Sequence, residues 1–315
     1  IANHQELDEA GFTVALAVAQ YQIDASGEQP VRLSVSSTDV SKKSDYPLTL
    51  QAATTLQGET ETAESTTIMK FVDCEADKDN SKKRKKNQIK FIIFHYTGMK
   101  SEKAAIKKLT DFKSEVSCNY FIKKNGEIIT MVPDLYTAWH AGKSLWKKYQ
   151  SLNKNSIGIE ITNPGHRHGY DRFSNSQIRS LIKLSRSLIK KYKINLKDIL
   201  GHSDIAPERK KDPGEKFPWE YLAKKNIGFW HSLNKKLLYK NRKIKIDSNQ
   251  KKIFIKNLFK IGYLIKKSKK LEPYSEKNLN LITKAFQRRF RQDLINGIID
   301  KECLIISHNL AKKLN

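Results

Sequence analysis

The segment from residue 91 to residue 94, Phe-Ile-Ile-Phe, constrains the fold more than any other part of the chain. Successive side chains of a strand point to opposite faces, and here both faces are apolar. A strand of this kind must be covered on both sides, which is typical of the middle of a sheet. His95 follows directly, so we expect a titratable side chain at the end of a buried strand.

Cap and turn signals predict the neighbouring elements. Ser101 is a suitable N-cap for a helix, and the apolar stripe of that helix consists of Ala105, Ile106, Leu109 and Phe112. Asn125-Gly126 is a two-residue hairpin signal between predicted strands over 117–123 and 127–132. A helix and a hairpin therefore follow the apolar strand.

A second strand is predicted over residues 156–162, where Ile157, Ile159 and Ile161 share one face. The other face carries Gly158, Glu160 and Thr162. Ser174 and Gln177 then form a capping box, which begins a helix with apolar residues at helical spacing. A short strand over 198–200 leads to Gly201-His202.

Strands and helices thus alternate in part, with one hairpin among them. This order predicts the α/β class, with a mixed central sheet flanked by helices. Beyond about residue 245 the pattern is purely helical, with three short apolar stripes. These predict a small, separate three-helix bundle over 245–315, after a catalytic domain over 91–240.

Charge divides the chain at Met69. Residues 1–68 hold three basic and ten acidic residues, whereas the whole chain has 59 basic and 33 acidic residues and a net charge of +26. Two interpretations stay open for 1–68: an ordinary domain boundary, or a leader or foreign segment before a native start at Met69. Residues 69–90 are predicted to be a basic linker.

The basic linker contains the run Lys82-Lys83-Arg84-Lys85-Lys86, which is typical either of a solvated segment or of a nucleic-acid-binding arm. We find no helix-turn-helix and no aromatic-rich RNA motif, so nucleic acid is not predicted as a partner. Three cysteines without a Cys-x-x-Cys pair exclude a disulfide framework. No apolar run approaches the ~18 residues of a membrane-spanning helix.

Three residues could hold a metal. His95 and His202 each follow a predicted strand, and Asp212 lies ten residues after His202. Two histidines and a carboxylate are a ligand set of catalytic zinc, which keeps one position open. Histidines at strand ends are also common as hydrogen-bonded structural residues, and composition alone leaves both interpretations open.

Two charged residues accompany this set. Glu160 lies in the middle of an isoleucine-rich strand, and burying an unpaired carboxylate is costly. It is therefore either paired with a lysine or poised as a base beside a metal. Lys210 lies two residues before Asp212, where an ammonium group could stabilise an oxyanion. Spacing alone fits a surface lysine equally well.

The chain resembles the AmpD/AmiD-type zinc N-acetylmuramoyl-L-alanine amidases through about residues 90–220. The resemblance rests on four motifs in order: Phe94-His95-Tyr96-Thr97, Trp139-His140-Ala141-Gly142, Ser156–Glu160, and the run over 201–214 from Gly-His-Ser-Asp to Lys-Asp-Pro-Gly. A weaker resemblance, carried by Ala285-Phe286-Gln287, Phe290, Asn296-Gly297 and Asp300, links the tail to the peptidoglycan-binding module of the AmiD branch.

The resemblance implies one zinc ion per chain, held by His95, His202 and Asp212. It implies that Glu160 is the general base and that Lys210 stabilises the transition state. His140 would line the substrate groove. Asn119 replaces a histidine common at that position, so we expect altered substrate contacts there.

The implied reaction is zinc-dependent hydrolysis of the amide between N-acetylmuramic acid and L-alanine, in peptidoglycan or its muropeptide fragments. The alternative is a non-catalytic peptidoglycan-binding protein of the same fold. We expect the bacterial cell envelope or periplasm as the compartment, with the cytoplasm as the alternative. The sequence does not indicate an oligomeric state.

Overall fold

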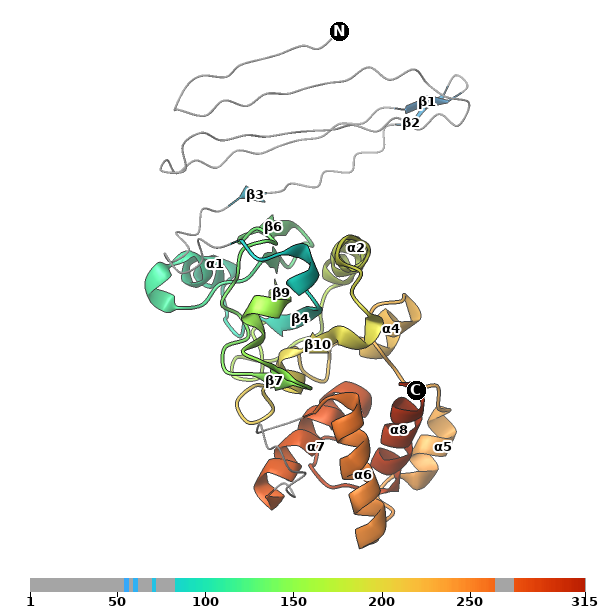
Figure 1. Ribbon diagram of the computed structural model, residues 1–315. Helices are drawn as coiled ribbons and strands as arrows, with labels where there is room; N and C mark the ends of the chain where they lie inside the picture. Colours follow the sequence, from blue (N-terminus) through green and yellow to red (C-terminus); the bar gives the residue numbers. More distant parts are fainter. Residues whose placement is uncertain (1–53, 57–58, 62–69, 72–82, 264–274, 315) are drawn as a thin grey trace, which may run out of the picture. The chain divides into compact units, whose positions relative to one another are not determined.

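The computed structural model describes residues 54–56, 59–61, 70–71, 83–263 and 275–314 (Figure 1). Most of the acidic segment 1–68 and of the basic linker 69–90 therefore lies outside the described residues. Within the acidic segment, β1 (Thr54–Leu56) and β2 (Glu59–Glu61) form an antiparallel pair.

A six-stranded sheet forms the centre of the fold, in the order β10-β4-β9-β5-β6-β3. Its strands are β3 (Lys70–Phe71), β4 (Phe91–Tyr96), β5 (Tyr120–Ile122), β6 (Ile128–Thr130), β9 (Ser156–Ile161) and β10 (Ile199–Gly201). The neighbours from β10 to β5 are parallel, β5 and β6 form the predicted antiparallel hairpin, and β3 is parallel to β6. The sheet is mixed, as predicted.

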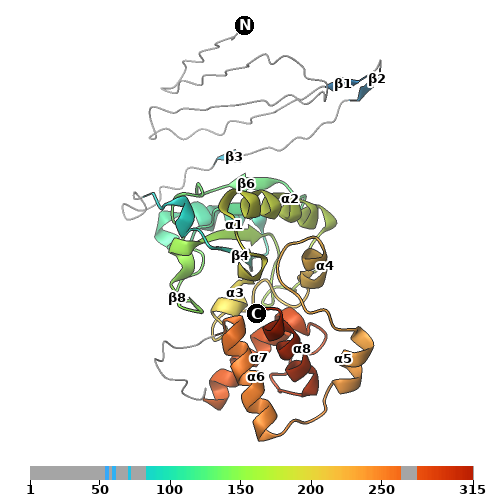
Figure 2. The ribbon, with the colours of Figure 1, turned by 45° about the vertical axis from the view of Figure 1, so that its right-hand side comes forward.

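Strand β4 lies between β10 and β9, which confirms that the Phe-Ile-Ile-Phe segment is a central strand. All four of its apolar residues are at most 1% exposed. On one face, Ile92 and Phe94 pack with the three isoleucines of β9 beneath α2 (Asn175–Tyr192), which lies over the sheet in Figure 2. The predicted capping box of Ser174 and Gln177 begins this helix.

On the opposite face, residues of the sheet belong to one buried cluster with residues of the C-terminal helices α6 (Ser248–Ile261), α7 (Glu276–Phe290) and α8 (Lys301–Lys312). Figures 1 and 2 show these helices gathered together. Phe91 and Ile93 belong to the same buried cluster as Phe254, Phe286 and other residues of the bundle. The three helices are present as predicted, and their buried residues belong to one hydrophobic cluster with residues of the sheet.

Helix α1 (Glu102–Thr110) begins at Ser101, whose side chain accepts a hydrogen bond from the Ala104 amide, as predicted. Ala105 and Leu109 are buried. Placing Phe112 on the same stripe is wrong, because α1 ends at Thr110 and Phe112 lies in a following 3-10 turn, 51% exposed. Asp111 takes an extended conformation and breaks the helical periodicity.

The remaining elements are short. The hairpin β7 (Leu145–Trp146) and β8 (Tyr149–Gln150) precedes β9. Helices α3 (His202–Ile205), α4 (Trp219–Lys224) and α5 (Lys235–Asn241) follow β10. Four 3-10 turns cover Lys86–Gln88, Phe112–Ser114, Leu152–Asn155 and Leu196–Asp198.

Part of the basic run is built into the domain. Arg84 is only 6% exposed, and its guanidinium donates to the backbone carbonyls of Asp134, Asn153 and Ser156 at 2.7–2.9 Å. Ile89 is likewise buried in the core beneath α2. This arginine therefore has a structural role and is not available to bind a phosphate backbone.

Within the described part of the chain, no helix combines the length and the apolar character that crossing a membrane requires.

Candidate metal centre and active site

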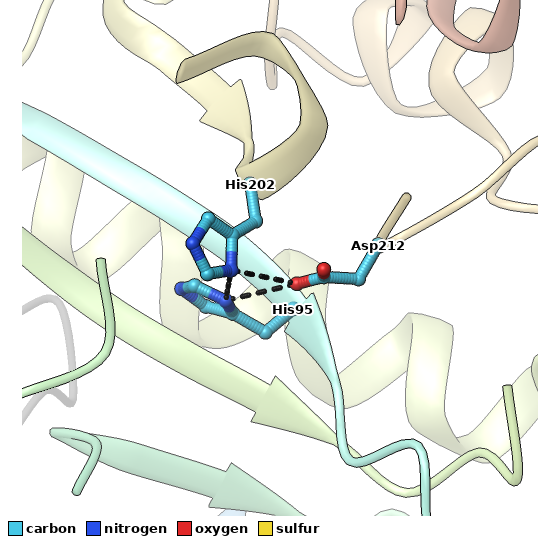
Figure 3. A group of neighbouring side chains, drawn as sticks. All are labelled: His95, His202 and Asp212. Atoms are coloured by element: carbon cyan, nitrogen blue, oxygen red, sulfur yellow. Dashed lines mark hydrogen bonds and ion pairs between the residues drawn. The ribbon is translucent and has the colours of Figure 1, made fainter. Parts of the chain in front are cut away.

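The sheet topology brings His95, His202 and Asp212 together (Figure 3). Strand β4 carries His95 near its end, and the neighbouring parallel strand β10 leads directly into His202, the first residue of α3. Nδ1 of His95 lies 2.9 Å from Nδ1 of His202 and 3.0 Å from Oδ2 of Asp212. Nδ1 of His202 lies 3.1 Å from the same oxygen. All three side chains are buried.

This triangle of atoms is suited to a metal ion. Each imidazole nitrogen offers either one proton or one lone pair, so three mutual contacts cannot all be hydrogen bonds. Ligands at about 2.0–2.1 Å from a tetrahedral zinc ion are separated by about 3.3 Å, close to the distances here. The arrangement therefore fits three ligand atoms around one ion better than it fits a structural hydrogen-bond network.

The protonation states also fit a metal site. Burial, followed by the charge of His202, lowers the pKa of His95 to about 4, so its imidazole is neutral at physiological pH. Burial alone would raise the pKa of Asp212, but His202 and His95 hold it well below its usual range. A neutral imidazole and an ionised carboxylate are the forms that bind metal.

The tautomer of His202 follows from its hydrogen bond. Its Nε2 lies 3.1 Å from the carbonyl oxygen of Ala141. A carbonyl can only accept, so this hydrogen bond requires the proton on Nε2; Nη2 of Arg209, 3.2 Å from the same nitrogen, donates instead to the Ala141 carbonyl. The lone pair of a neutral His202 is therefore on Nδ1, which faces His95 and Asp212.

A chain of hydrogen bonds orients His95 in the same way. Ser156 donates its hydroxyl proton to the Leu152 carbonyl at 2.7 Å, so it accepts from Nε2 of His140 at 3.2 Å. Burial lowers the pKa of His140 well below its ordinary value, so its ring is neutral and its Nδ1 accepts. Nδ1 accepts from Nε2 of His95 at 3.0 Å. This leaves the Nδ1 lone pair of His95 toward the metal site.

Gly158 makes room for this chain. A Cβ atom at Gly158 would lie 2.3 Å from Cγ of His140, a distance at which atoms clash. Ser156, Gly158 and Glu160 alternate along β9 on the face that carries the site. The small residue between two polar ones thus provides the space in which the His140 ring sits against the strand.

A groove of about 460 Å³ opens over the candidate metal site. Its lining includes His140, Glu160, Lys210 and Asp212, as well as Tyr96 and Trp139. Gly158 does not line the groove, because the His140 ring fills the space beside it. Thr162 instead points to Glu102, to whose carboxylate it donates at 2.9 Å.

Glu160 lies beside the metal-binding group. It is paired in register with His95 on the neighbouring strand, and its Oε2 has no hydrogen-bond partner among the described residues. Burial, and then the charge of Asp212, raises the pKa of Glu160 to about 8, whereas the charge of Lys210 opposes the rise. The structural alternative, a carboxylate paired with a lysine, is not found here.

Lys210 is half-buried in the wall of the groove, and its neighbour Lys211 is exposed. The charge of Lys210 contributes to the pKa values of both Glu160 and His95, after the larger effect of burial. Lys210 thus lines the same groove as Glu160 and Asp212.

The structure corrects the expectation for Asn119. Its side chain is fully buried and is not part of the groove lining. It accepts from the Gly158 amide at 3.0 Å and donates to the Val132 carbonyl at 3.1 Å. Asn119 thus ties β9 to the chain after β6, and we assign it a structural role in place of the predicted substrate contact.

Sequence reasoning did not identify the contacts of two neighbours of the site. His166 is partly buried and lies within 3.0 Å of the Tyr96 hydroxyl and of the Glu215 carboxylate. Arg209 donates to the carbonyls of Ala141 and Lys143, and so holds the loop that accepts from His202. Neither contact joins residues close in sequence, so no local pattern indicates it.

Comparisons with known proteins agree with this site. A family model described as N-acetylmuramoyl-L-alanine amidase matches residues 85–215, which include all the groove residues discussed above. The N-acetylmuramoyl-L-alanine amidase AmiD of Escherichia coli K12 is 33% identical over 238 residues, covering 72% of this chain and 83% of AmiD. The 1,6-anhydro-N-acetylmuramyl-L-alanine amidase AmpD of the same strain is 40% identical over 106 residues, covering 33% of this chain and 55% of AmpD.

Solved structures show the same fold. The structure of E. coli AmiD in complex with the substrate anhydro-N-acetylmuramic acid-L-Ala-D-γ-Glu-L-Lys has a TM-score of 0.63 at 28% identity, covering 83% of this chain and 97% of that one. AmpDh3 from Pseudomonas aeruginosa has a TM-score of 0.62 at 26% identity, with 77% and 98% covered. Because the extended match to AmiD includes most of both proteins, the chain belongs to the family of N-acetylmuramoyl-L-alanine amidases.

Proposed function

We propose that this protein is a zinc-dependent hydrolase of the amide bond between N-acetylmuramic acid and L-alanine, in peptidoglycan or its muropeptide fragments. One zinc ion per chain would be held by His95, His202 and Asp212. The observation that carries the proposal is the triangle of three ligand atoms, 2.9–3.1 Å apart, beside a carboxylate oxygen that lacks a partner among the described residues.

The chemistry follows from the positions of these groups. When bound, zinc supplies Lewis acidity, which polarises the scissile carbonyl and makes water a stronger acid at neutral pH. Glu160 would accept the proton of the attacking water. As the carbon–nitrogen bond breaks, Glu160 would pass that proton to the leaving amine of L-alanine. Its unpartnered Oε2 is free to accept a proton without first breaking a hydrogen bond.

Lys210 would act on the negative charge that develops on the carbonyl oxygen in the tetrahedral intermediate. A fixed cation in a partly water-excluded groove stabilises such charge more strongly than it would in bulk water. The groove is also lined by Lys108, Arg167, Arg209 and Lys211. This basic lining suits a substrate whose stem peptide carries carboxylates.

We further propose that the C-terminal region, from about residue 245, binds polymeric peptidoglycan. Support comes from the resemblance noted in the sequence and from a second cavity of about 600 Å³, which residues of the C-terminal region line together with residues between 196 and 242. It is lined by residues of α4, α5 and α8 together with the aromatic side chains Trp230, Tyr239 and Phe290. Aromatic rings beside charged groups suit a glycan that bears charged peptides.

Cosedimentation with purified sacculi tests this second proposal. The full-length His202→Ala protein would serve as the background, so that cleavage does not release the bound chain. Tyr239, which is 54% exposed, is the side chain to change. Tyr239→Ala should weaken cosedimentation, and unchanged binding would argue against this cavity.

The main experiment incubates the protein with intact sacculi and, separately, with anhydro-muropeptides, each with and without a metal chelator. Mass analysis should detect free stem peptide and a sugar product lacking it, and the chelator should abolish both. Binding without any release of peptide would instead favour the non-catalytic alternative.

The two substrates also bear on the site of action. Cleavage of sacculi fits the cell envelope or periplasm, which we propose as the compartment. A strict preference for anhydro-muropeptides fits cytoplasmic turnover of fragments.

A further inference from the structure

Helix α7 of the C-terminal region contacts the segment that carries two of the three proposed metal ligands. Arg289 donates from Nη1 to Oδ2 of Asp204 at 2.5 Å and from Nη2 to the Ile199 carbonyl at 2.8 Å. Ile199 begins β10 and Asp204 lies in α3, so the two contacts flank His202. Arg289 and Asp204 are 3% and 1% exposed.

Asp204 connects Arg289 to the segment from Gly201 to Asp204, which carries His202. Its Oδ1 accepts from the Tyr263 hydroxyl at 2.6 Å, and its Oδ2 also accepts from the Gly201 amide at 2.8 Å. The Gly201 amide directly precedes His202. The carboxylate therefore joins the C-terminal region to the backbone at the point where the histidine leaves β10.

The second ligand is connected to the same helix. The Ser203 amide donates to the Asp212 carbonyl at 2.8 Å, which links the two ligand segments to each other. Just beyond α7, Gln292 donates to the carbonyls of Glu215 and Phe217 at 2.7 and 2.6 Å. The segment from Ile199 to Phe217 is thus held at two places. Arg289 of α7 holds it beside His202, and Gln292, just beyond α7, holds it after Asp212.

We infer that Arg289 is a positioning residue for the metal site, acting through Asp204 on His202. The inference rests on the proposed function, because it presupposes metal at His95, His202 and Asp212. Without Arg289, Asp204 would be a buried carboxylate that has lost its cation and two hydrogen bonds to α7 would be absent, a costly state that movement of the segment from Gly201 to Asp204 would relieve. Moving α3 displaces Nδ1 of His202 from the other two ligand atoms.

The test compares two arginines at the same end of α7 in the full-length protein. Arg289→Met removes the contact with α3. Arg291→Met removes an equally buried ion pair, with Asp300 at 2.5 Å, that lies wholly within the C-terminal region. The zinc dissociation constant is measured by competition with a chromogenic chelator, and thermal unfolding is recorded alongside.

Arg289→Met should weaken zinc binding by about 10- to 100-fold, the usual effect of losing a group that orients metal ligands. Arg291→Met should lower the unfolding temperature but leave zinc affinity close to that of the wild type. Wild-type zinc affinity in Arg289→Met would overturn the inference. Equal losses of affinity in both variants would overturn it too, since general destabilisation would then be the cause.

Two further variants keep the test decisive if Arg289→Met does not fold. Asp204→Asn combined with Arg289→Met leaves no unpaired charge and should bind zinc more weakly than the wild type. Gln292→Ala removes the contacts after Asp212 and should weaken zinc binding to a smaller extent. Wild-type affinity in both would overturn the inference.

The His95→Ala protein separates this inference from the proposed function. Zinc that is bound by the wild type and lost in His95→Ala establishes the metal site. Against that baseline, unchanged zinc affinity in the Arg289 variants rejects the positioning role alone. Failure of the wild type itself to bind zinc would reject the proposed function and the inference with it.

Discussion

His95 and Glu160 occupy paired positions on the neighbouring parallel strands β4 and β9. The pairing places a nitrogen of the metal-binding group and a carboxylate oxygen without a described partner beside the same groove. Strand register thus brings together a residue that would hold the ion and a residue that would move protons. Substitution can separate these two roles.

The ligands and the base should respond differently to removal. His95→Ala, His202→Ala and Asp212→Ala should each lose most bound zinc, because each leaves only two of three protein ligands. Glu160→Gln should keep its zinc and lose about 100- to 10,000-fold in turnover. Metal analysis of the four purified variants checks this, and zinc loss in Glu160→Gln equal to that in the others would refute its role as a base.

Lys210→Ala should lower kcat by roughly 100- to 1,000-fold while KM changes little, because an oxyanion donor acts only once charge develops. Lys210→Arg should not restore full activity, since the guanidinium is larger and planar. Steady-state kinetics on a soluble muropeptide measure both. Lys211→Ala is the comparison: as part of the basic lining, Lys211 should affect KM and leave kcat nearly unchanged, and an equal loss of kcat in Lys211→Ala would contradict the assignment.

The hydrogen-bond chain behind His95 should support zinc affinity. His140→Ala removes the acceptor for Nε2 of His95 and should weaken zinc binding by about 10- to 100-fold. Gly158→Ala should act in the same direction, because its Cβ would displace the His140 ring. Chelator competition measures both, with the exposed His168 changed to alanine as a control. Unaltered affinity in Gly158→Ala and His140→Ala would show that the chain is dispensable.

The contribution of Glu160 to the stability of metal-free protein should fall as pH rises from about 4.5 to 8. The pKa of Glu160 is raised from its ordinary value of 4.5 to about 8 in the folded chain, chiefly by burial. At this carboxyl group the folded state therefore binds more protons than the unfolded state across this window, so the contribution of Glu160 to the free energy of unfolding decreases as pH increases.

Glu160→Gln, which stays neutral, should be more stable than the wild type at pH 8, and the two should converge near pH 4.5. Urea titrations of metal-free protein at several pH values compare them. Zinc-loaded wild type should show a weaker dependence, because a nearby cation favours the carboxylate. A wild type that gains stability relative to Glu160→Gln as pH rises would contradict the shift.

Much of the fold was predictable because its signals are local. The apolar run of β4, the Asn125-Gly126 turn and the two helix caps at Ser101 and Ser174 each lie within a few residues and depend on little else. Phe112 was misplaced because helical periodicity continues across Asp111, whereas the helix itself does not. The extended conformation of Asp111, the C-cap of α1, ends the helix although the apolar spacing continues.

Contacts between distant residues could not be predicted in this way. The buried pair of Arg289 and Asp204 joins residues 85 positions apart, and neither has a sequence neighbour that indicates the other. Asn119 was read through the resemblance as a residue that contacts substrate, although its amide bridges two backbone segments. The sequence could suggest which residues take part in the site, but not which buried partners orient them.

The shared core limits how freely this protein could be recombined with its relatives. Phe91 and Ile93 of the central strand belong to the same buried cluster as Phe254 and Phe286 of the C-terminal helices, so dividing the chain at residue 245 would expose apolar side chains on both parts. A chimera that joined this catalytic region to another tail would expose that apolar face and leave Asp204 buried without its arginine. The catalytic region and the C-terminal helices would therefore have to be exchanged together. A functional chimera would need to keep the matching buried residues of both regions.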